Sequence, residues 1–179
     1  LMHPLGLNGL IAKKRALPNY RQRWCTHILK IEPYRAWLKQ QAPACSYVGL
    51  RADEEGRAGG AYNDIPGIIQ RFPLQEWEWG LDEVWGYLDS LAVHIPRRLD
   101  CNRCFFQTLY EWWLLWYEHP EIYAEAEAQE AMTGHTFRSA ARDSWPADLY
   151  SLRKRFEQGH VPKQRTSALQ QLQCRMCTL

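Results

Sequence analysis

The feature that most constrains the fold is a C-x-x-C motif directly before a long aromatic segment. Cys101 and Cys104 are separated by two residues, and the residues from Cys104 to Trp116 include three tryptophans. A C-x-x-C turn brings two thiolates within reach of one metal ion or cluster, and a helix N-terminus favours the anionic sulfur. We therefore predict that Cys104 opens an aromatic helix and that the motif is half of a zinc or iron–sulfur site. The alternative is two buried cysteines that pack as small apolar side chains.

Further ligands for such a site must come from elsewhere in the chain. Cys25 lies among Arg21, Arg23, His27 and Lys30, and neighbouring cations favour a thiolate, so Cys25 is either a third ligand or a nucleophile. The alternative is a solvated basic face with one buried cysteine. A second C-x-x-C motif near the end of the chain supplies Cys174 and Cys177. The predicted ligand set is Cys25, Cys101, Cys104 and Cys177. A zinc site built from both C-x-x-C motifs, Cys101, Cys104, Cys174 and Cys177, is the alternative.

Composition limits the class of protein. A chain of 179 residues with 46% hydrophobic and 23% charged residues is typical of one globular domain with a real core. The net charge of +2 argues neither for nor against a nucleic-acid partner. No apolar run approaches the ~20 residues that a membrane helix needs, and no segment resembles a signal peptide. Six cysteines in such a chain indicate a reducing compartment, so we expect a cytoplasmic protein without a membrane partner.

The pattern of apolar residues predicts an α/β fold. We expect short strands at residues 45–50 and 73–77, an apolar connector at 65–72, and a core-packed helix at 81–91. Further helices are expected at 5–15, 33–41, 121–132 and 147–158. The prediction is a truncated parallel sheet of two or three strands covered by several helices, with a helix-rich C-terminal half. Residues 1–160 would form this domain, and 161–179 a basic linker with the C-x-x-C tail.

A polar, glycine-rich loop follows the first predicted strand and carries Arg51 and Arg57. Arginines at the carboxyl end of a strand suit the capture of phosphate or sulfate. The alternative is that they pair with the carboxylates of the same loop, Asp53, Glu54 and Glu55. A second loop, around His135 and Arg138, offers two further possible anion contacts.

Several of these segments occur in the order seen in one family. The stretch Arg23–Pro33 resembles the R-C-C/T-x-x-x-K-x-x-P segment of adenylyl sulfate and phosphoadenosine phosphosulfate reductases, and Gly49–Arg57 resembles their G-L/I-R-x-x-E/D…R substrate loop. Residues 73–88 are similar to their P-L-x-D-W-x-x-x-D-V-W-x-Y-L segment. Cys101 and Cys104 lie where the iron–sulfur members carry their C-x-x-C. The resemblance covers roughly residues 10 to 110, and the C-terminal half is closer to uncharacterised bacterial and phage members.

The resemblance implies nucleotide-dependent sulfur chemistry, either sulfonucleotide reduction or sulfur transfer. Arg51, Arg57 and Lys30 would contact the anion, and the cysteines would hold a four-iron four-sulfur cluster rather than zinc. The family's first strand and S-G-G-x-D-S phosphate loop have no counterpart here. We therefore expect a chain that is inactive alone. Either a separate chain or fragment carries the nucleotide-binding half, or the chain is a natural truncation that no longer does the chemistry.

A different function class competes with this one. The chain would then be a non-catalytic binding or accessory protein, for example a phage-encoded anti-defence factor, that keeps a metal-stapled core and binds a protein partner through its aromatic surface. The nine tryptophans in the chain are compatible with such a surface as well as with a core. Whether the chain is an enzyme is therefore left open by the sequence.

Overall fold

The structure is a computed structural model that describes residues 3–57, 64–94 and 101–164, with backbone only at 55–57. The described chain divides into two compact units. A helical unit combines residues 3–29 with 101–164, and a sheet unit contains residues 30–57 and 64–94. Because the chain leaves the helical unit and returns to it, the sheet unit is an insertion in the sequence of the helical one.

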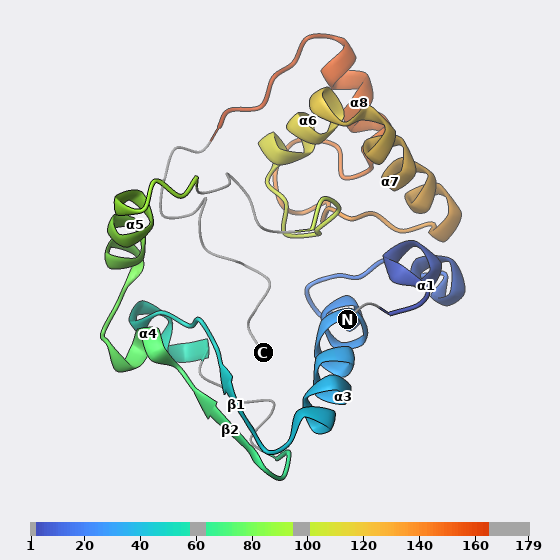
Figure 1. Ribbon diagram of the computed structural model, residues 1–179. Helices are drawn as coiled ribbons and strands as arrows, with labels where there is room; N and C mark the ends of the chain where they lie inside the picture. Colours follow the sequence, from blue (N-terminus) through green and yellow to red (C-terminus); the bar gives the residue numbers. More distant parts are fainter. Residues whose placement is uncertain (1–2, 58–63, 95–100, 165–179) are drawn as a thin grey trace. The chain divides into compact units, whose positions relative to one another are not determined.

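The helical unit is built from helices at both ends of the chain. Its elements are α1 (Gly6–Lys14), α2 (Trp24–Thr26), the start of the π-helix η1 (His27–Ile31), α6 (Leu109–Glu118), α7 (Pro120–Thr133) and α8 (Leu149–Glu157). Helix α7 packs against both α6 and α8 (Figure 1). Helices were predicted at the positions of α1, α7 and α8, and those predictions are confirmed within two residues at each end.

Local sequence explains where these helices begin and end. The Thr108 hydroxyl accepts the Glu111 backbone N–H at 3.2 Å, and the Glu111 carboxylate accepts the Thr108 N–H at 2.6 Å, which is a capping box. Pro120 starts α7 because its missing N–H is not needed in a first turn. Asp148 caps α8 by accepting the Ser151 N–H at 2.7 Å.

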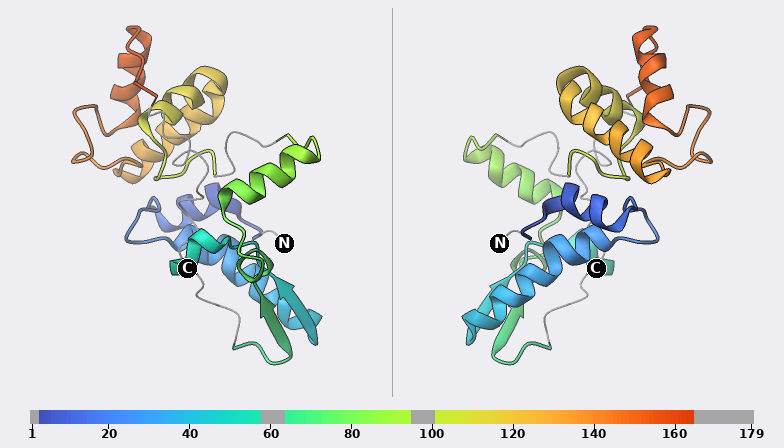
Figure 2. Two further views of the ribbon diagram at one scale, coloured as in Figure 1. Left: turned by 90° about the vertical axis from the view of Figure 1, so that its left-hand side faces the viewer. Right: turned by 90° about the vertical axis from the view of Figure 1, so that its right-hand side faces the viewer.

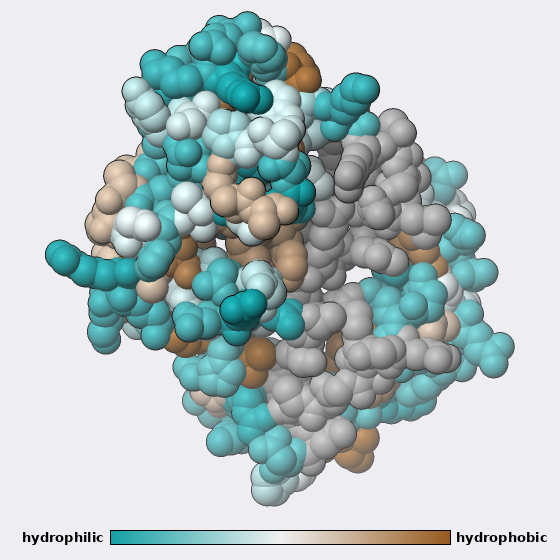
Figure 3. Space-filling model, turned by 180° about the vertical axis from the view of Figure 1, so that it is seen from behind, coloured by the Kyte–Doolittle hydropathy of each residue, from teal (hydrophilic) through white to brown (hydrophobic). Residues whose placement is uncertain are grey.

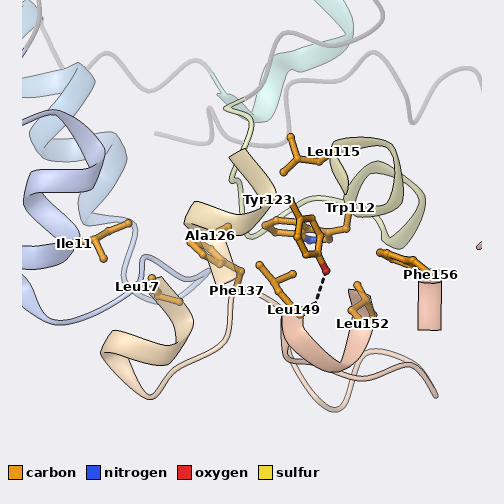
Figure 4. Packing of buried hydrophobic residues seen from close by; sticks show 10 residues of the cluster. All are labelled: Ile11, Leu17, Trp112, Leu115, Tyr123, Ala126, Phe137, Leu149, Leu152 and Phe156. Carbon is orange, nitrogen blue, oxygen red and sulfur yellow. Dashed lines mark hydrogen bonds between the residues drawn. The ribbon is translucent and has the colours of Figure 1, made fainter. Parts of the chain in front are cut away.

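The core of the helical unit is aromatic and continuous. Trp112 is fully buried and packs edge-on against Tyr123, with ring centroids 6.2 Å apart, and against Phe137 at 5.7 Å. Figure 4 shows the Tyr123 hydroxyl donating a hydrogen bond to the Leu149 carbonyl, at 2.7 Å. The buried cluster joins α1, α6, α7, α8 and the loops between them, and its members are Ile11, Leu17, Trp112, Leu115, Tyr123, Ala126, Phe137, Leu149, Leu152 and Phe156.

The sheet unit has a much smaller core. Its elements are α3 (Glu32–Gln41), β1 (Ala44–Tyr47), the 3-10 helix η2 (Ala52–Arg57), β2 (Ile68–Arg71), α4 (Pro73–Glu76) and α5 (Leu81–Ser90). Strands β1 and β2 are parallel, with Ala44 opposite Ile68 and Tyr47 opposite Arg71, and they lie side by side in Figures 1 and 2. Leu38 of α3 packs with Ile65 and Ile68, and these three residues form the buried cluster.

The predicted α/β class with a partial parallel sheet is confirmed, but three predictions about the strands are wrong. The second strand is Ile68–Arg71, within the segment predicted to be a connector, and Pro73–Glu76 is a helix. Pro73 occupies the first helical turn, where a residue without an N–H is tolerated. The first strand ends at Tyr47 rather than at residue 50.

The aromatic helix does not begin at Cys104, because the capping box sets its start at Leu109 and residues 101–107 form turns.

Helix α5 forms as predicted, but none of its residues is buried, so its apolar face is not the core face that we expected. Trp85 on this face is exposed. On the side of the molecule seen in Figure 3, hydrophilic residues predominate and apolar residues form small separate groups.

Candidate functional site at the carboxyl edge of the sheet

The parallel pairing brings two segments together at one edge of the sheet. The Val48 N–H donates to the Arg71 carbonyl at 2.9 Å, which continues the ladder past the end of β1. Beyond this point, the Ala52 N–H donates to the Trp79 carbonyl at 2.8 Å. The Gln75 side-chain amide also donates to the Arg51 carbonyl at 3.4 Å. The loop after β1 and the segment after β2 are therefore fixed to each other where ligands bind in open α/β sheets.

Arg51 is the best-held charged side chain at this edge. Its Nε lies 2.8 Å from Asp53 Oδ1, and its Nη2 lies 3.7 Å from Glu54 Oε1. Its backbone N–H also donates to Glu54 Oε2 at 3.3 Å. Arg51 is buried, so these carboxylates hold the guanidinium in one place and compensate its charge. Of the two interpretations of this loop, the pairing with its own carboxylates is the arrangement observed for Arg51.

The other predicted anion ligands are less defined. Arg57 ends η2, and its side chain lies outside the described residues. Lys30 lies in the π-helix η1, and its side chain is exposed. The π-helical turn ends just before Pro33, which cannot donate a backbone hydrogen bond. Only Arg51 of the three is therefore placed with its partners at the sheet edge.

A second arginine at the edge was missed by the sequence analysis. Arg71 ends β2 and forms a two-contact ion pair with Glu76 of α4, with Nε 3.0 Å from Oε1 and a second contact between Nη2 and Oε2. Hydrogen bonding to Arg71 lowers the pKa of the Glu76 carboxyl, and the same bond raises the pKa of Arg71. The sequence did contain a signal for this arginine, because Arg71 follows the apolar pair Ile68–Ile69, but that segment was interpreted as a connector and not as a strand.

Aromatic side chains adjoin the same edge. The ring centroids of Trp77 and Trp79 are 5.5 Å apart, and Trp79 is 5.5 Å from Tyr87 of α5. Trp77 is 60% exposed and Tyr87 is 52% exposed, although large aromatic side chains are usually buried. Because the Trp79 carbonyl also accepts the Ala52 N–H, this cluster is tied directly to the Arg51 loop. The edge thus combines exposed π-faces with two arginines.

Three of the predicted metal ligands, Cys25, Cys101 and Cys104, lie in the described part of the helical unit. Cys104 is buried, and its sulfur accepts the Phe106 N–H at 3.4 Å, whereas Cys101 is exposed and Cys25 is intermediate. Cys104 lies before α6 rather than at its N-terminus, so the predicted position of this sulfur at a helix start is wrong. Cys174 and Cys177 lie outside the described residues.

Among the residues described, no three His, Cys, Asp or Glu side chains are grouped closely enough to hold a metal ion. The described residues therefore do not by themselves form the ligand set of a cluster or of a zinc ion. The iron–sulfur cluster and its zinc alternative stay predictions.

Two further findings bear on the identity of the chain. Within residues 3–57, 64–94 and 101–164, no helix combines the length and the apolar character needed to cross a membrane. Comparison with protein-family models, with characterised proteins and with solved structures finds no match for this sequence.

Proposed function

We propose that the carboxyl edge of the β1–β2 sheet binds a sulfonucleotide such as adenylyl sulfate, and that the chain serves nucleotide-dependent sulfur chemistry of the reductase or sulfurtransferase type. One observation carries the proposal. The two segments that resemble the family's substrate loop and its P-L-x-D-W region are fixed to each other by the hydrogen bonds from Ala52 to Trp79 and from Gln75 to Arg51. Two motifs matched independently in sequence thus meet at one place in the fold.

The chemistry of the edge fits the two ends of such a ligand. A guanidinium gives charge-assisted hydrogen bonds to sulfate or phosphate oxygens, and Arg51 is held in place before any ligand arrives. The exposed rings of Trp77 and Tyr87 offer faces on which an adenine can stack. For the anion to bind, Arg51 must share or exchange its contacts with Asp53 and Glu54, so those carboxylates set the strength of binding.

The test is calorimetric titration of adenylyl sulfate into the purified chain and its variants. Arg51→Ala should weaken binding by at least several-fold, because a hydrogen bond to a charged group contributes about 1.5–3 kcal/mol. Arg35→Ala is the matched control, since Arg35 lies in the same unit and forms an exposed ion pair with Asp64 at 2.6 Å. Equal affinity in wild type and Arg51→Ala would remove Arg51 from the site.

We propose that the purified chain by itself has no reductase or transferase turnover. Catalysis requires a loop of backbone N–H groups that positions the nucleotide phosphates, and the family's S-G-G-x-D-S loop does not occur in this sequence. An adenylyl-sulfate-dependent rate from the purified chain that is lost in Cys25→Ser would contradict this.

A second candidate function is a non-catalytic binding or accessory protein, and two observations favour it. Arg51 is already charge-compensated by Asp53 and Glu54, which weakens its attraction for an anion. Trp77 and Tyr87 are exposed on the surface, and aromatic residues are enriched where proteins meet partners. Wild-type protein that binds no adenylyl sulfate would favour this function over the first.

A further inference from the structure

The positive charge of the chain is concentrated in one stretch of its sequence. Residues 1–31 contain six lysines and arginines and no aspartate or glutamate, whereas the other 16 basic residues are outnumbered by 20 acidic ones. The net charge of +2 therefore combines a segment of +6 with a remainder of −4. Such an asymmetry is typical of a surface that binds a polyanion, and the total charge conceals it.

Four of these cations lie on the helical unit, and we call them the basic patch. Lys13 and Lys14 occupy the last turn of α1, Arg15 follows directly, and Arg21 lies in the next turn of the chain. All four residues are exposed. The charges of the basic patch therefore face solvent and not the core.

The fold brings the two parts of the basic patch into one segment. The Asn19 side-chain oxygen accepts the N–H groups of Arg21 and Gln22, each at 2.9 Å, so the chain turns at residues 19–22. After this turn the Lys14 ammonium lies 5.6 Å from the ring centroid of Trp24, which places the returning chain beside the end of α1. The basic patch thus occupies one compact segment, residues 13–24.

None of the carboxylates in the described part of the chain pairs with the basic patch. On α7, Glu125 accepts Arg103 at 2.9 Å and Asn8 at 3.4 Å. In the loop that follows α7, Asp143 accepts Arg138 at 2.8 Å. Arg138 is therefore held within its own loop and is not the anion contact that the sequence suggested, and the charge of the basic patch is left for a partner.

The dipole of α1 explains only part of this arrangement. Cations near the carboxyl end of a helix are favourable, which accounts for Lys13 and Lys14, but the effect is confined to the last turn and does not reach Arg21. Arg15 has φ 51°, in the left-handed region where glycine is preferred. A cation thus occupies a position where glycine would fit the backbone better.

The apolar side chains of this segment favour nucleic acid over a membrane as the partner. Ile11 and Leu17 are buried in the core of the helical unit (Figure 4), and the exposed ring of Tyr20 lies 5.4 Å from the Arg21 guanidinium. Helices that bind membrane surfaces insert apolar side chains among the lipids, and these side chains are not available for that. Binding to a phosphate backbone requires only the cations.

We propose that the basic patch binds the phosphate backbone of nucleic acid without reading its sequence. Each lysine or arginine neutralises one phosphate and releases counterions to the solvent. Four such contacts correspond to non-specific affinity, with a Kd of about 1–100 µM at physiological salt. This surface belongs to the helical unit, and it does not rest on the function proposed for the sheet edge.

The experiment is fluorescence anisotropy of a labelled DNA duplex of about 20 base pairs, and of a single strand of equal length, titrated with the full chain at several salt concentrations. The slope of log Kd against log salt for the duplex should be about 3–4, because each phosphate contact contributes about 0.9. The triple variant Lys13→Ala, Lys14→Ala, Arg21→Ala should bind about ten-fold or more weakly and lower this slope by about 2–3.

A matched control removes the same charge elsewhere. Lys39→Ala, Lys154→Ala, Lys163→Ala also deletes three exposed cations, and it should change the Kd by less than about three-fold.

Arg15→Gly separates the loss of charge from any loss of folding. It removes one cation at a position whose φ of 51° suits glycine, so the fold should be retained. Binding should weaken by about two- to four-fold, and the salt slope should fall by about 1. Thermal unfolding of every variant is the folding control.

Three outcomes would overturn the proposal. Wild-type protein that binds neither probe in a salt-dependent way would remove the function. Equal weakening in the two triple variants would assign binding to net charge rather than to the basic patch. Binding to phosphatidylserine vesicles that the patch variant loses, without binding to either probe, would make the patch a membrane contact. Arg51→Ala should bind both probes as wild type does, so this surface and the sheet edge can fail separately.

Discussion

The helical unit and the sheet unit use similar residues in opposite ways. In the helical unit Trp112, Tyr123 and Phe156 are buried in one continuous core. In the sheet unit Trp77, Trp85 and Tyr87 are exposed, and the buried cluster consists of Leu38, Ile65 and Ile68. A small buried cluster contributes little stabilisation because hydrophobic stabilisation scales with the apolar area removed from water. The difference indicates that the helical unit supplies stability and that the sheet unit presents surface.

One buried carboxylate of the helical unit and two carboxylates of the sheet unit have opposite pKa shifts. Glu130 of α7 is buried and accepts the N–H groups of Phe137 at 2.8 Å and of Leu149 at 2.6 Å. Burial raises the pKa of Glu130 to about 7, against the backbone hydrogen bonds that lower it. Asp64 and Glu76 of the sheet unit are exposed, and hydrogen bonds from Arg35 and Arg71 lower their pKa. Burial therefore controls the pKa of Glu130, whereas surface ion pairing controls the pKa of Asp64 and Glu76, as it also does for Glu157 in the helical unit.

The largest expected effect comes from the aromatic core. Trp112→Ala should lower the free energy of unfolding by about 3–5 kcal/mol, because it leaves a cavity between Tyr123 and Phe137. That is a large part of the ~5–15 kcal/mol typical of a folded protein. Urea unfolding followed by circular dichroism measures it. Trp77→Ala is the matched control of the same residue type, and since Trp77 is exposed it should change stability by less than ~0.5 kcal/mol.

Hydrogen exchange tests directly whether the helical unit is more stable than the sheet unit. Amides of α6 and α7 should exchange far more slowly than those of β1 and β2, because the sheet unit can open with little buried area exposed. Equal protection in both units, or a Trp112→Ala variant as stable as wild type, would contradict the division of roles.

The second effect is a pH dependence located in the helical unit. Because the folded-state pKa of Glu130 lies above its ordinary value of 4.5, the folded state holds this proton more tightly than the unfolded state does. The free energy of unfolding should therefore fall as the pH rises from about 4.5 to about 7, by up to roughly 3 kcal/mol, and then level off.

Unfolding in urea at pH 5, 6, 7 and 8 measures this dependence. Glu130→Gln keeps the size of the side chain but cannot titrate, so its stability should vary much less across this range. Glu157→Gln, which removes a carboxylate of α8 that pairs with Arg153 at 2.7 Å, is the control and should retain the wild-type slope. A slope that persists in Glu130→Gln would assign the titration to another group.

The sequence predicted the framework of both units better than the details of the site. Helices α7 and α8 were predictable because a proline or a capping aspartate marks the start and a glycine lies just beyond the end; Gly134 has φ 67° after α7. The parallel pairing followed from the α/β pattern. The position of β2 did not, because a four-residue apolar strand cannot be told from a connector by periodicity alone.

The errors at the site have the same physical origin. The apolar spacing continues from Phe105 into α6, so the pattern concealed the boundary that Thr108 and Glu111 set by capping. Periodicity gave α5 an apolar face but could not show what covers it. Arg71 was missed because its role depends on β2 and on Glu76, while the pairing of Arg51 with Asp53 had been foreseen as one of two alternatives.

The smallest effect tests the boundary of the aromatic helix. Thr108→Ala removes the acceptor for the Glu111 N–H and should cost about 1 kcal/mol in unfolding free energy. Thr108→Ser keeps the hydroxyl and should be nearly neutral. In the sheet unit, the N-cap residue of α5 is Gly80, which has no side-chain acceptor, and the Glu83 carboxylate accepts the Gly80 N–H at 2.9 Å. Glu83→Gln should therefore change stability less than Thr108→Ala, and the reverse order would show that the sheet unit bears more of the stability than its small buried cluster implies.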